Sequence, residues 1–233
     1  MKKRKILLVT TNTERIDINN VSKEHRKDRI IEDDTSQYPL GLAYLHSAAE
    51  TAGNELRTLF LNNRSDQHCF NEIRESLEFF LPEVIGFQML TQNRVSTYRM
   101  IEYIHEKHPQ IRIIIGGIHA TLMYKQIIEK YPYIIAILGE GEVTLPELVN
   151  ELFKPEPNLG FIDGIAFINN RAVTKTNPRK LIENLDNIPF PKHEIFFTKK
   201  RTAGSIMTTR GCPFNCSFCC LESISRRQVR KRS

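Results

Sequence analysis

The sequence predicts an α/β fold that is built on an open, parallel, five-stranded sheet. Within the first 153 residues, short apolar runs alternate with segments of helical length and pattern. Short apolar runs bounded by polar residues are typical of strands that are covered on both faces. Strands that alternate with helices in this way form a parallel sheet. The 233 residues are enough for one complete domain of ordinary size and an additional segment.

Each predicted strand is a short run that ends at a polar or glycine-containing loop. The first run follows the basic start of the chain directly and is too short for the core of a signal peptide. A polar stretch, Asn12–Ser36, follows it and predicts a long loop. The five predicted strands are Lys5–Thr10, Glu55–Leu61, Val84–Gln88, Ile111–Ile115 and Ile134–Leu138.

The predicted helices lie between and after these strands, and proline or glycine marks most of their ends. Pro39 lies near the start of the first helix, and Gly53 lies just past its end. Pro82, Pro109 and Pro132 end the next three helices. The predicted helices are Pro39 to about Ala52, Phe70–Phe80, Tyr98–His108, Leu122–Tyr131, and a last one that follows Glu142 and runs to about Phe153.

The pattern changes after residue 153. The stretch Pro155–Asn158 indicates a domain boundary, and two short runs on either side of Asn169-Asn170 predict a small hairpin over Gly164–Thr176. Pro178–Lys192 lacks periodicity and predicts an extended linker, and Ser205–Thr209 predicts one more strand. We therefore expect an α/β domain over residues 1–153, a linker with a hairpin over 154–202, and the start of a further domain over 203–233.

Positive charge is concentrated at the end of the chain. Residues 199–233 contain nine Lys or Arg residues and one acid, a net +8, so the total of +6 leaves −2 for the rest. A basic tail is typical of a nucleic-acid-binding arm, but Phe214 and Phe218 are the only aromatic residues there that could stack on bases. We expect a surface that faces a further part of the protein. No stretch reaches the length of a membrane span, and we expect a cytoplasmic protein.

Four of the five cysteines lie within nine residues. An odd number of cysteines without a secretion signal argues against a disulfide framework. Cys212, Cys216 and Cys219 have the spacing C-x3-C-x2-C, which allows three thiolates to hold three corners of an iron–sulfur cluster and leaves one iron open. Cys220 directly follows Cys219 and points elsewhere. A zinc site with His193 as a fourth ligand is the alternative.

A ligand site is predicted at the carboxyl ends of the strands, where open α/β sheets bind their ligands. Glycine there allows the backbone to approach a bulky ligand closely. No G-x-G-x-x-G follows a strand, which argues against a dinucleotide. The four loops concerned are Thr10–Asn12, Gln88–Thr91, Gly116–Ala120 and Gly139–Glu142.

The stretch Thr208–Cys219 resembles the cluster-binding loop of radical S-adenosyl-L-methionine (SAM) enzymes. The resemblance implies that Cys212, Cys216 and Cys219 bind a [4Fe-4S] cluster, whose open iron binds SAM. It also implies that Phe218 lies near the adenine of SAM.

Four further motifs are similar, in this order, to the B12-binding half of cobalamin-dependent radical SAM proteins: Pro39–Leu45, Ile115–Ala120, Gly139–Glu142 and Asp186–Pro191. This resemblance implies a Rossmann-like (flavodoxin-like) B12-binding domain, followed by the linker and the first strand of a truncated radical SAM (β/α) barrel. The residues expected to contact cobalamin are Thr10, Thr11, Asn12, Leu40, Gly41, Gln88, Gly116, Gly117, His119, Gly139, Glu140 and Gly141.

The chain departs from the D-x-H-x-x-G pattern, whose histidine binds cobalt in many B12 domains. Asp66–Asn71 lacks the glycine and follows the second strand, whereas that pattern follows the first. We therefore expect His68 to be a surface or loop residue. We expect cobalamin to bind without a protein ligand to cobalt, with His119 away from the metal and the nucleotide tail beside Gly116-Gly117 and Gly139–Gly141.

The resemblance implies the N-terminal portion of an enzyme that uses SAM, a [4Fe-4S] cluster and cobalamin for methyl transfer or for radical rearrangement or cyclisation. The expected partners are a small-molecule, peptide or natural-product substrate and an electron donor such as flavodoxin or ferredoxin. The 233 residues alone are expected not to cleave SAM. Two alternatives stay open: a non-catalytic cobalamin-binding module, and a zinc-stabilised interaction protein whose basic tail meets an acidic partner.

Overall fold

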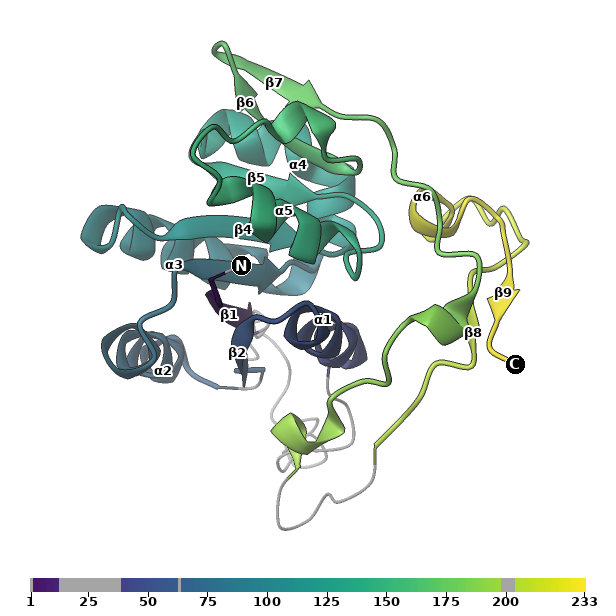
Figure 1. The fold of residues 1–233 in the computed structure, drawn as a ribbon, viewed down its shortest axis with the longest axis horizontal. Helices are drawn as coiled ribbons and strands as arrows, with labels where there is room; N and C mark the ends of the chain where they lie inside the picture. The colour runs from purple at the N-terminus through teal and green to yellow at the C-terminus, as the bar shows by residue number, and fades with distance from the viewer. Residues whose placement is uncertain (1, 13–38, 63, 198–203) are drawn as a thin grey trace, which may run out of the picture.

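A seven-stranded sheet with helices on both faces forms the centre of the fold (Figure 1). The computed structural model describes residues 2–12, 39–62, 64–197 and 204–233. The predicted loop over residues 12–36 therefore lies, apart from Asn12, outside the described residues, as does residue 203. The five predicted parallel strands are present as β1 (Lys5–Thr10), β2 (Glu55–Phe60), β3 (Val84–Gln88), β4 (Arg112–Gly116) and β5 (Ile134–Ile137).

The strand order is β2-β1-β3-β4-β5, and all neighbours in this series are parallel. This is the flavodoxin-like order, so the predicted fold class is confirmed. The chain moves outward from β1 to β2 and then returns to place β3 on the other side of β1. That reversal is the topological switch point, where ligands of open α/β sheets bind.

The predicted hairpin is present as β6 (Ile165–Asn169) and β7 (Ala172–Lys175). Its turn places Asn170 and Arg171 at φ of 49° and 64°, as a tight two-residue hairpin turn requires. The hairpin is part of the sheet: β6 pairs antiparallel with β5, so the sheet has seven strands where five were predicted. This pairing covers the edge of β5, whose four residues are all buried.

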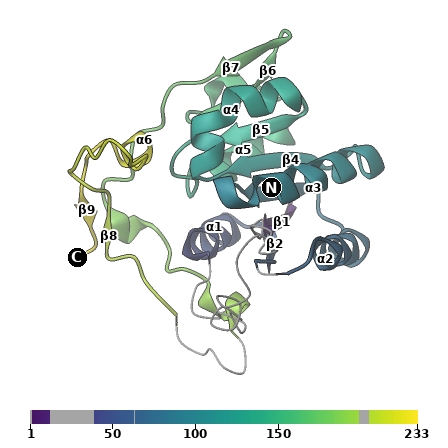
Figure 2. The same cartoon turned by 180° about the vertical axis from the view of Figure 1, so that it is seen from behind.

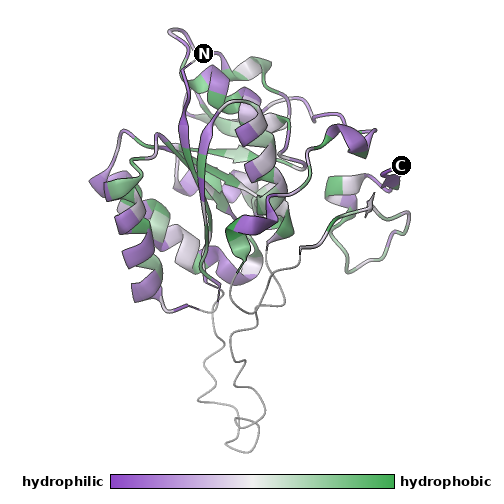
Figure 3. Ribbon diagram, turned by 60° about the horizontal axis from the view of Figure 1, so that its bottom comes forward, coloured by the Kyte–Doolittle hydropathy of each residue, from purple (hydrophilic) through white to green (hydrophobic). Residues whose placement is uncertain are grey.

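Two helices cover one face of the sheet and three cover the other (Figures 1 and 2). Alternate residues of β1 point to opposite faces: Ile6 and Leu8 pack with the first pair, and Leu7 and Val9 with the three. The pair consists of α1 (Leu40–Thr51) and α5 (Thr144–Leu152). The three are α2 (Asp66–Phe79), α3 (Arg94–Lys107) and α4 (Ile118–Lys130). Figure 3 shows apolar residues concentrated along the strands at the centre.

Helices α2, α3 and α4 each begin four residues, about one turn, before their predicted starts. Polar and backbone contacts help to stabilise these first turns, which also contain the buried residues Cys69 in α2 and Ala120 in α4. The Ser65 hydroxyl accepts a hydrogen bond from the His68 N–H at 3.2 Å and caps α2. Before α3, a 3₁₀ turn, η3 (Thr91–Asn93), is closed by the Leu90 N–H, which donates to the Asn93 side chain at 2.8 Å.

The last part of the chain lies beside the carboxyl ends of the strands (Figures 1 and 2). The predicted strand Ser205–Thr209 is wrong in extent, because only β8 (Thr209–Arg210) is paired, with β9 (Arg230–Lys231). A short helix, α6 (Glu222–Ser225), lies between them. The linker contains the 3₁₀ turns η4 (Leu159–Phe161), η5 (Leu185–Asn187) and η6 (His193–Phe196). Among the described residues, no helix is both long and apolar enough to cross a membrane.

The end of α2 provides a test of backbone strain. Leu81 follows the C-cap residue with φ of 54°, and its N–H donates to the Ser76 carbonyl at 3.2 Å. Glycine normally occupies this left-handed position. We predict that Leu81→Gly raises the free energy of unfolding by about 1 kcal/mol, because the left-handed conformation costs other residues roughly 1–2 kcal/mol and the freedom of glycine in the unfolded chain offsets part of that gain.

Urea denaturation followed by circular dichroism measures this change. Leu81→Ala is the matched control, because it removes the same exposed side chain and keeps the strained backbone. An equal effect of the two substitutions would show that strain at Leu81 is negligible.

Candidate cofactor-binding site

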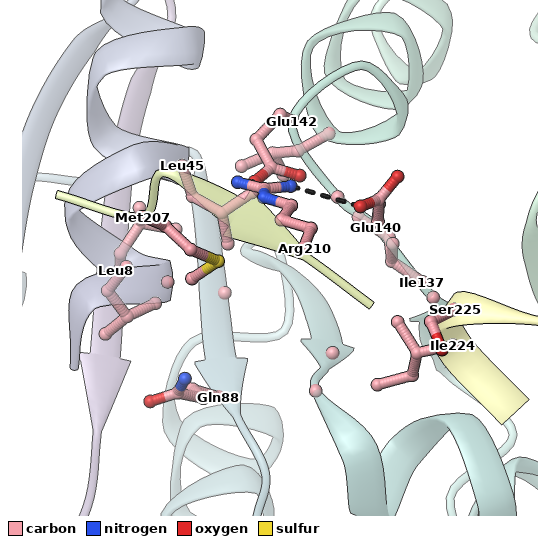
Figure 4. A pocket seen from close by; sticks show the side chains of 18 of the residues that line it. Leu8, Leu45, Gln88, Ile137, Glu140, Glu142, Met207, Arg210, Ile224 and Ser225 are labelled. Atoms are coloured by element: carbon pink, nitrogen blue, oxygen red, sulfur yellow. Dashed lines mark hydrogen bonds and ion pairs between the residues drawn. The ribbon is translucent and has the colours of Figure 1, made fainter. Parts of the chain in front are cut away.

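A cavity of about 510 Å³ lies at the carboxyl ends of the parallel strands (Figure 4). Its floor is apolar and comes from the strands and α1. Its walls are the loops that follow β4 and β5. A third group of lining residues comes from the last part of the chain and is called the roof here: Met207, Thr209, Arg210, Gly211, Leu221, Ile224, Ser225 and Arg230.

Glycines form much of the wall, and they leave room for a bulky group. A Cβ atom added at Gly139 would meet no described atom within 4 Å, and one added at Gly116 would come no closer than 3.9 Å to its neighbours. These missing side chains leave space beside the cavity. The glycines that line it, apart from Gly211 of the roof, are Gly41, Gly86, Gly116, Gly117, Gly139 and Gly141.

Gly117 has a different role, because it lets two loops touch. Its φ is 92°, and an added Cβ would lie 2.9 Å from the Met89 carbonyl oxygen. The Met89 N–H donates to the Gly116 carbonyl at 2.7 Å, and the His119 N–H donates to the Met89 carbonyl at 3.2 Å. These contacts tie the loop after β3 to the start of α4. They also hold Gln88, which accepts a hydrogen bond from the Thr10 hydroxyl at 2.8 Å, at the cavity.

Two acids and two arginines form a buried ion network between the wall and the roof. Arg210 lies between Glu142 and Glu140, with N–O distances of 2.5 and 3.2 Å (Figure 4). Arg230 donates to both oxygens of Glu140, at 2.8 and 3.0 Å. All four side chains are about nine-tenths buried. We call these four residues the ion network.

The network keeps Glu140 and Arg210 charged in spite of their burial. Burial by itself raises the pKa of Glu140, but the hydrogen bonds from Arg230 and the Ile182 N–H, with the charges of Arg230 and Arg210, hold that pKa below its ordinary value. Burial by itself lowers the pKa of Arg210, but Glu142 and Glu140 raise it above its ordinary value. The wall and the roof are therefore joined at neutral pH by an ion pair between Glu140 and Arg210.

Helix α1 holds the roof at a second point. The Arg210 guanidinium lies 5.1 Å from the centre of the Tyr44 ring, a cation–π distance. The Tyr44 hydroxyl accepts a hydrogen bond from the Met207 N–H at 3.0 Å. Tyr44 itself is almost fully buried. The strand β8 is thus fixed both by the acids after β5 and by an aromatic residue of α1.

The structure brings seven of the predicted cofactor contacts together at the cavity: Gly41, Gln88, Gly116, Gly117, Gly139, Glu140 and Gly141. Within the described parts of the chain, the other predicted residues of this α/β domain are not in the lining. Thr10 contacts the cavity only through Gln88. Leu40, the first residue of α1, is partly buried and packs against the apolar core.

The other three residues are Thr11, Asn12 and His119. They contact α3, α2 and the loop after β3, respectively. The Thr11 hydroxyl is 2.8 Å from that of Thr97, and the Asn12 amide donates to Asp66 at 2.9 Å. The His119 ring is 3.2 Å from the Thr91 hydroxyl, and burial lowers its pKa. His68 is exposed on α2, as expected of a surface residue, although it lies in a helix rather than a loop.

The cysteine loop follows the roof strand β8 directly. Cys212 is half-buried, whereas Cys216 and Cys219 are exposed, and the Cys219 N–H donates to the Cys216 carbonyl at 3.0 Å. Phe218 is 91% exposed. In the described residues, no group of three or more His, Cys, Asp or Glu side chains is placed to hold a metal ion. The three thiols have the chemistry and spacing of cluster ligands, but in this structure they are not gathered around one metal position.

Sequence reasoning missed the roof. Arg210, Arg230 and Arg232 belong to the basic tail, and all three fold back on the rest of this chain. Arg232 donates to the Ile188 carbonyl at 2.7 Å and lies 4.9 Å from the Phe190 ring. Charge was the sequence signal that could have indicated this contact. Glu140 and Glu142 lie in a glycine loop at the ligand-binding edge of the sheet, where two acids require a cationic partner.

This chain is similar to known proteins over most of its length. A family model described as the B12 binding domain matches residues 27–149. A Pyrococcus horikoshii protein named as an uncharacterized methyltransferase is 32% identical over 191 residues, which are 79% of this chain and 41% of the relative. The anaerobic magnesium-protoporphyrin IX monomethyl ester cyclase of Rubrivivax gelatinosus is 30% identical, over 78% of this chain and 34% of the relative. The chain therefore spans well under half the length of these relatives.

Solved structures show the same fold at low identity. The cobalamin-dependent SAM radical enzyme OxsB with aqua-cobalamin bound has a TM-score of 0.75 and 20% identity, covering 100% of this chain and 30% of that one. The radical SAM methyltransferase TsrM from Kitasatospora setae, with cobalamin and [4Fe-4S] cluster bound, has a TM-score of 0.71 and 18% identity, covering 100% of this chain and 45% of that one.

The close approach at Gly117 can be measured. We predict that Gly117→Ala lowers the free energy of unfolding by about 2 kcal/mol or more, because strain at a left-handed residue and a backbone clash both contribute. Gly53→Ala is the matched control: Gly53 has φ of 91°, and an added Cβ would meet no described atom within 4 Å. Urea denaturation of both variants isolates the clash. If the two lose equal stability, the contact between Gly117 and Met89 does not constrain the site.

Proposed function

This chain belongs to the B12-binding domain family, and from that premise we propose that it binds cobalamin in the cavity at the carboxyl ends of β1, β3, β4 and β5. One observation carries the proposal: the glycine-lined cavity lies at the ligand-binding edge of the sheet, and the matched region includes its glycine loops. A large ligand with a flat face needs this close approach of backbone.

The residues that would hold cobalamin are on three loops and one helix. Gly116 ends β4 and Gly117 follows it, Gly139 and Gly141 come after β5, Gln88 ends β3, and Gly41 lies in the first turn of α1. Backbone N–H groups at the start of α4 can meet a phosphate group. When bound, cobalamin supplies a cobalt–carbon bond that can carry a methyl group. The apolar floor and the roof would limit the access of water to the bound ligand.

We further propose that the chain acts as part of a cobalamin-dependent radical SAM enzyme, most simply a methyltransferase. The order of its motifs and the names of its relatives support this proposal. Cys212, Cys216 and Cys219 would bind the [4Fe-4S] cluster, and Phe218 would lie against SAM. A small-molecule, peptide or natural-product substrate and a flavodoxin or ferredoxin as electron donor belong to the same proposal.

We predict that anaerobic reconstitution with iron and sulfide gives a [4Fe-4S] cluster that depends on Cys216 and is independent of Cys220. The reason is the spacing of the three proposed ligands, from which Cys220 is excluded by its direct succession to Cys219. Absorption and EPR spectroscopy measure the cluster. Cys220→Ala is the control, since Cys216 and Cys220 are both exposed. Loss of the cluster in Cys220→Ala together with its retention in Cys216→Ala would refute the assignment, and binding of zinc alone would favour the structural-metal alternative.

We also predict that cobalamin binds without a histidine on cobalt. Among the described residues, the cavity lining contains no histidine, the His119 ring is buried beside Thr91, and His68 is exposed on α2. EPR of the Co(II) form is the measurement. His119→Ala and His68→Ala are expected to leave the spectrum unchanged. Nitrogen superhyperfine splitting that either substitution abolishes would overturn the prediction.

A further inference from the structure

We infer that Glu140 is a positioning residue that holds the cysteine loop against the cavity through Arg210 and Arg230. This inference deepens the proposed function and rests on it for the identity of the ligand. The docking of the roof by Glu140 is independent of the ligand, because every contact that carries it is within the chain.

One carboxylate holds both strands of the roof. Its Oε1 atom accepts from Arg210 at 3.2 Å and from Arg230 at 3.0 Å, and its Oε2 atom accepts from Arg230 at 2.8 Å and from the Ile182 N–H at 3.2 Å. Arg210 and Arg230 are directly paired across the β8–β9 ladder. Glu140 therefore contacts both strands of the β8–β9 ribbon, through two residues that face each other across it.

The position of Arg210 is transmitted to the first cysteine. Gly211 follows with φ of 99°, and a Cβ atom there would lie 1.8 Å from the Gln228 carbonyl oxygen. The backbone between Arg210 and Cys212 is thus pressed against the segment that leads into β9. A movement of Arg210 away from Glu140 has to move Cys212 as well.

The ion network also lies in the wall of the cavity. Its four members all line the space in which the ligand is proposed to bind. A ligand there contacts the charges that hold the roof, so occupancy of the cavity and the position of the roof are linked. Removal of Glu140 leaves two buried arginines with one acid. Arg230 is less able than Arg210 to stay buried, because its Nε atom has no hydrogen-bond partner among the described residues.

Amide hydrogen exchange, followed by mass spectrometry on the full 233-residue chain, tests the docking without ligand. In Glu140→Gln, exchange over residues 207–212 and 228–232 is expected to accelerate about tenfold or more, because a buried arginine that has lost its acid drives local opening. Exchange in β3 and β4 is expected to stay unchanged. Glu83→Gln is the matched control: Glu83 pairs with Arg4 at 2.6 Å, at the opposite end of the sheet.

Three further variants, Glu142→Gln, Arg210→Gln and their combination, keep the test decisive if Glu140→Gln does not fold. Glu142→Gln removes one contact of Arg210 and is expected to accelerate exchange in the same two segments to a smaller extent. The double variant is expected to exchange little faster than Arg210→Gln alone, because both substitutions remove the same ion pair between Arg210 and Glu142. Unchanged exchange in the roof of Glu140→Gln, or of Glu142→Gln if only that variant folds, would overturn the inference.

Addition of hydroxocobalamin separates positioning from folding stability. In the wild-type chain, it is expected to slow exchange both in residues 116–119 and in residues 207–212. In Glu140→Gln, protection of residues 116–119 is expected to persist and protection of residues 207–212 to be lost. Retained protection of both segments in that variant would contradict the inference. Absence of hydroxocobalamin binding by the wild-type chain would instead refute the proposed function, while the ligand-free comparison still decides the role of Glu140.

Discussion

The parallel pairing of β1, β3, β4 and β5 is the constraint on which the other features depend. Parallel strands place all their carboxyl ends at one edge, so the loops after β3, β4 and β5 have to share that edge. Side chains of ordinary size would crowd there, and Gly117 shows how closely the loops approach one another. The glycines therefore let the loops fit together, and they leave a cavity where Gly116 and Gly139 lack side chains.

Charge at the same edge determines how the cavity is covered. Glu140 and Glu142 are buried acids, and an isolated buried carboxylate is costly unless a cation and hydrogen bonds accompany it. Arg210 and Arg230 supply both, and Tyr44 supplies an apolar surface for Arg210. Residues more than sixty positions apart in sequence are thus joined because each sign of charge is buried with the other. The acids of the α/β domain and the arginines of the positive tail therefore pair with each other.

The parallel strands could be predicted from the sequence, because a strand that is buried on both faces is recognised from its own apolar residues. β1 and β3 begin and end where predicted. The helix starts could not be found in this way, since Ser65 and Asn93 stabilise first turns that carry little apolar pattern. Pairing of β6 with β5 and docking of Arg210 and Arg230 on Glu140 are contacts between distant segments. No local pattern specifies them, and so the pairing of the predicted hairpin with the sheet and the docking of the roof were missed, while the glycine loops were predicted.

The cysteine loop begins at a firmly held segment of backbone, whereas its later thiols are exposed. Its lead-in is held by Glu140, Tyr44 and the contact between Gly211 and Gln228, whereas Cys216 and Cys219 are exposed. This division has a physical reason in the proposed cluster site. Several thiolates repel one another until a metal compensates their charge, and part of the free energy of metal binding orders such a loop. A firmly held first segment limits the chain that has to be ordered to the few residues between the donors. It also keeps the donors next to the cavity, where the edge of the sheet places the second proposed cofactor.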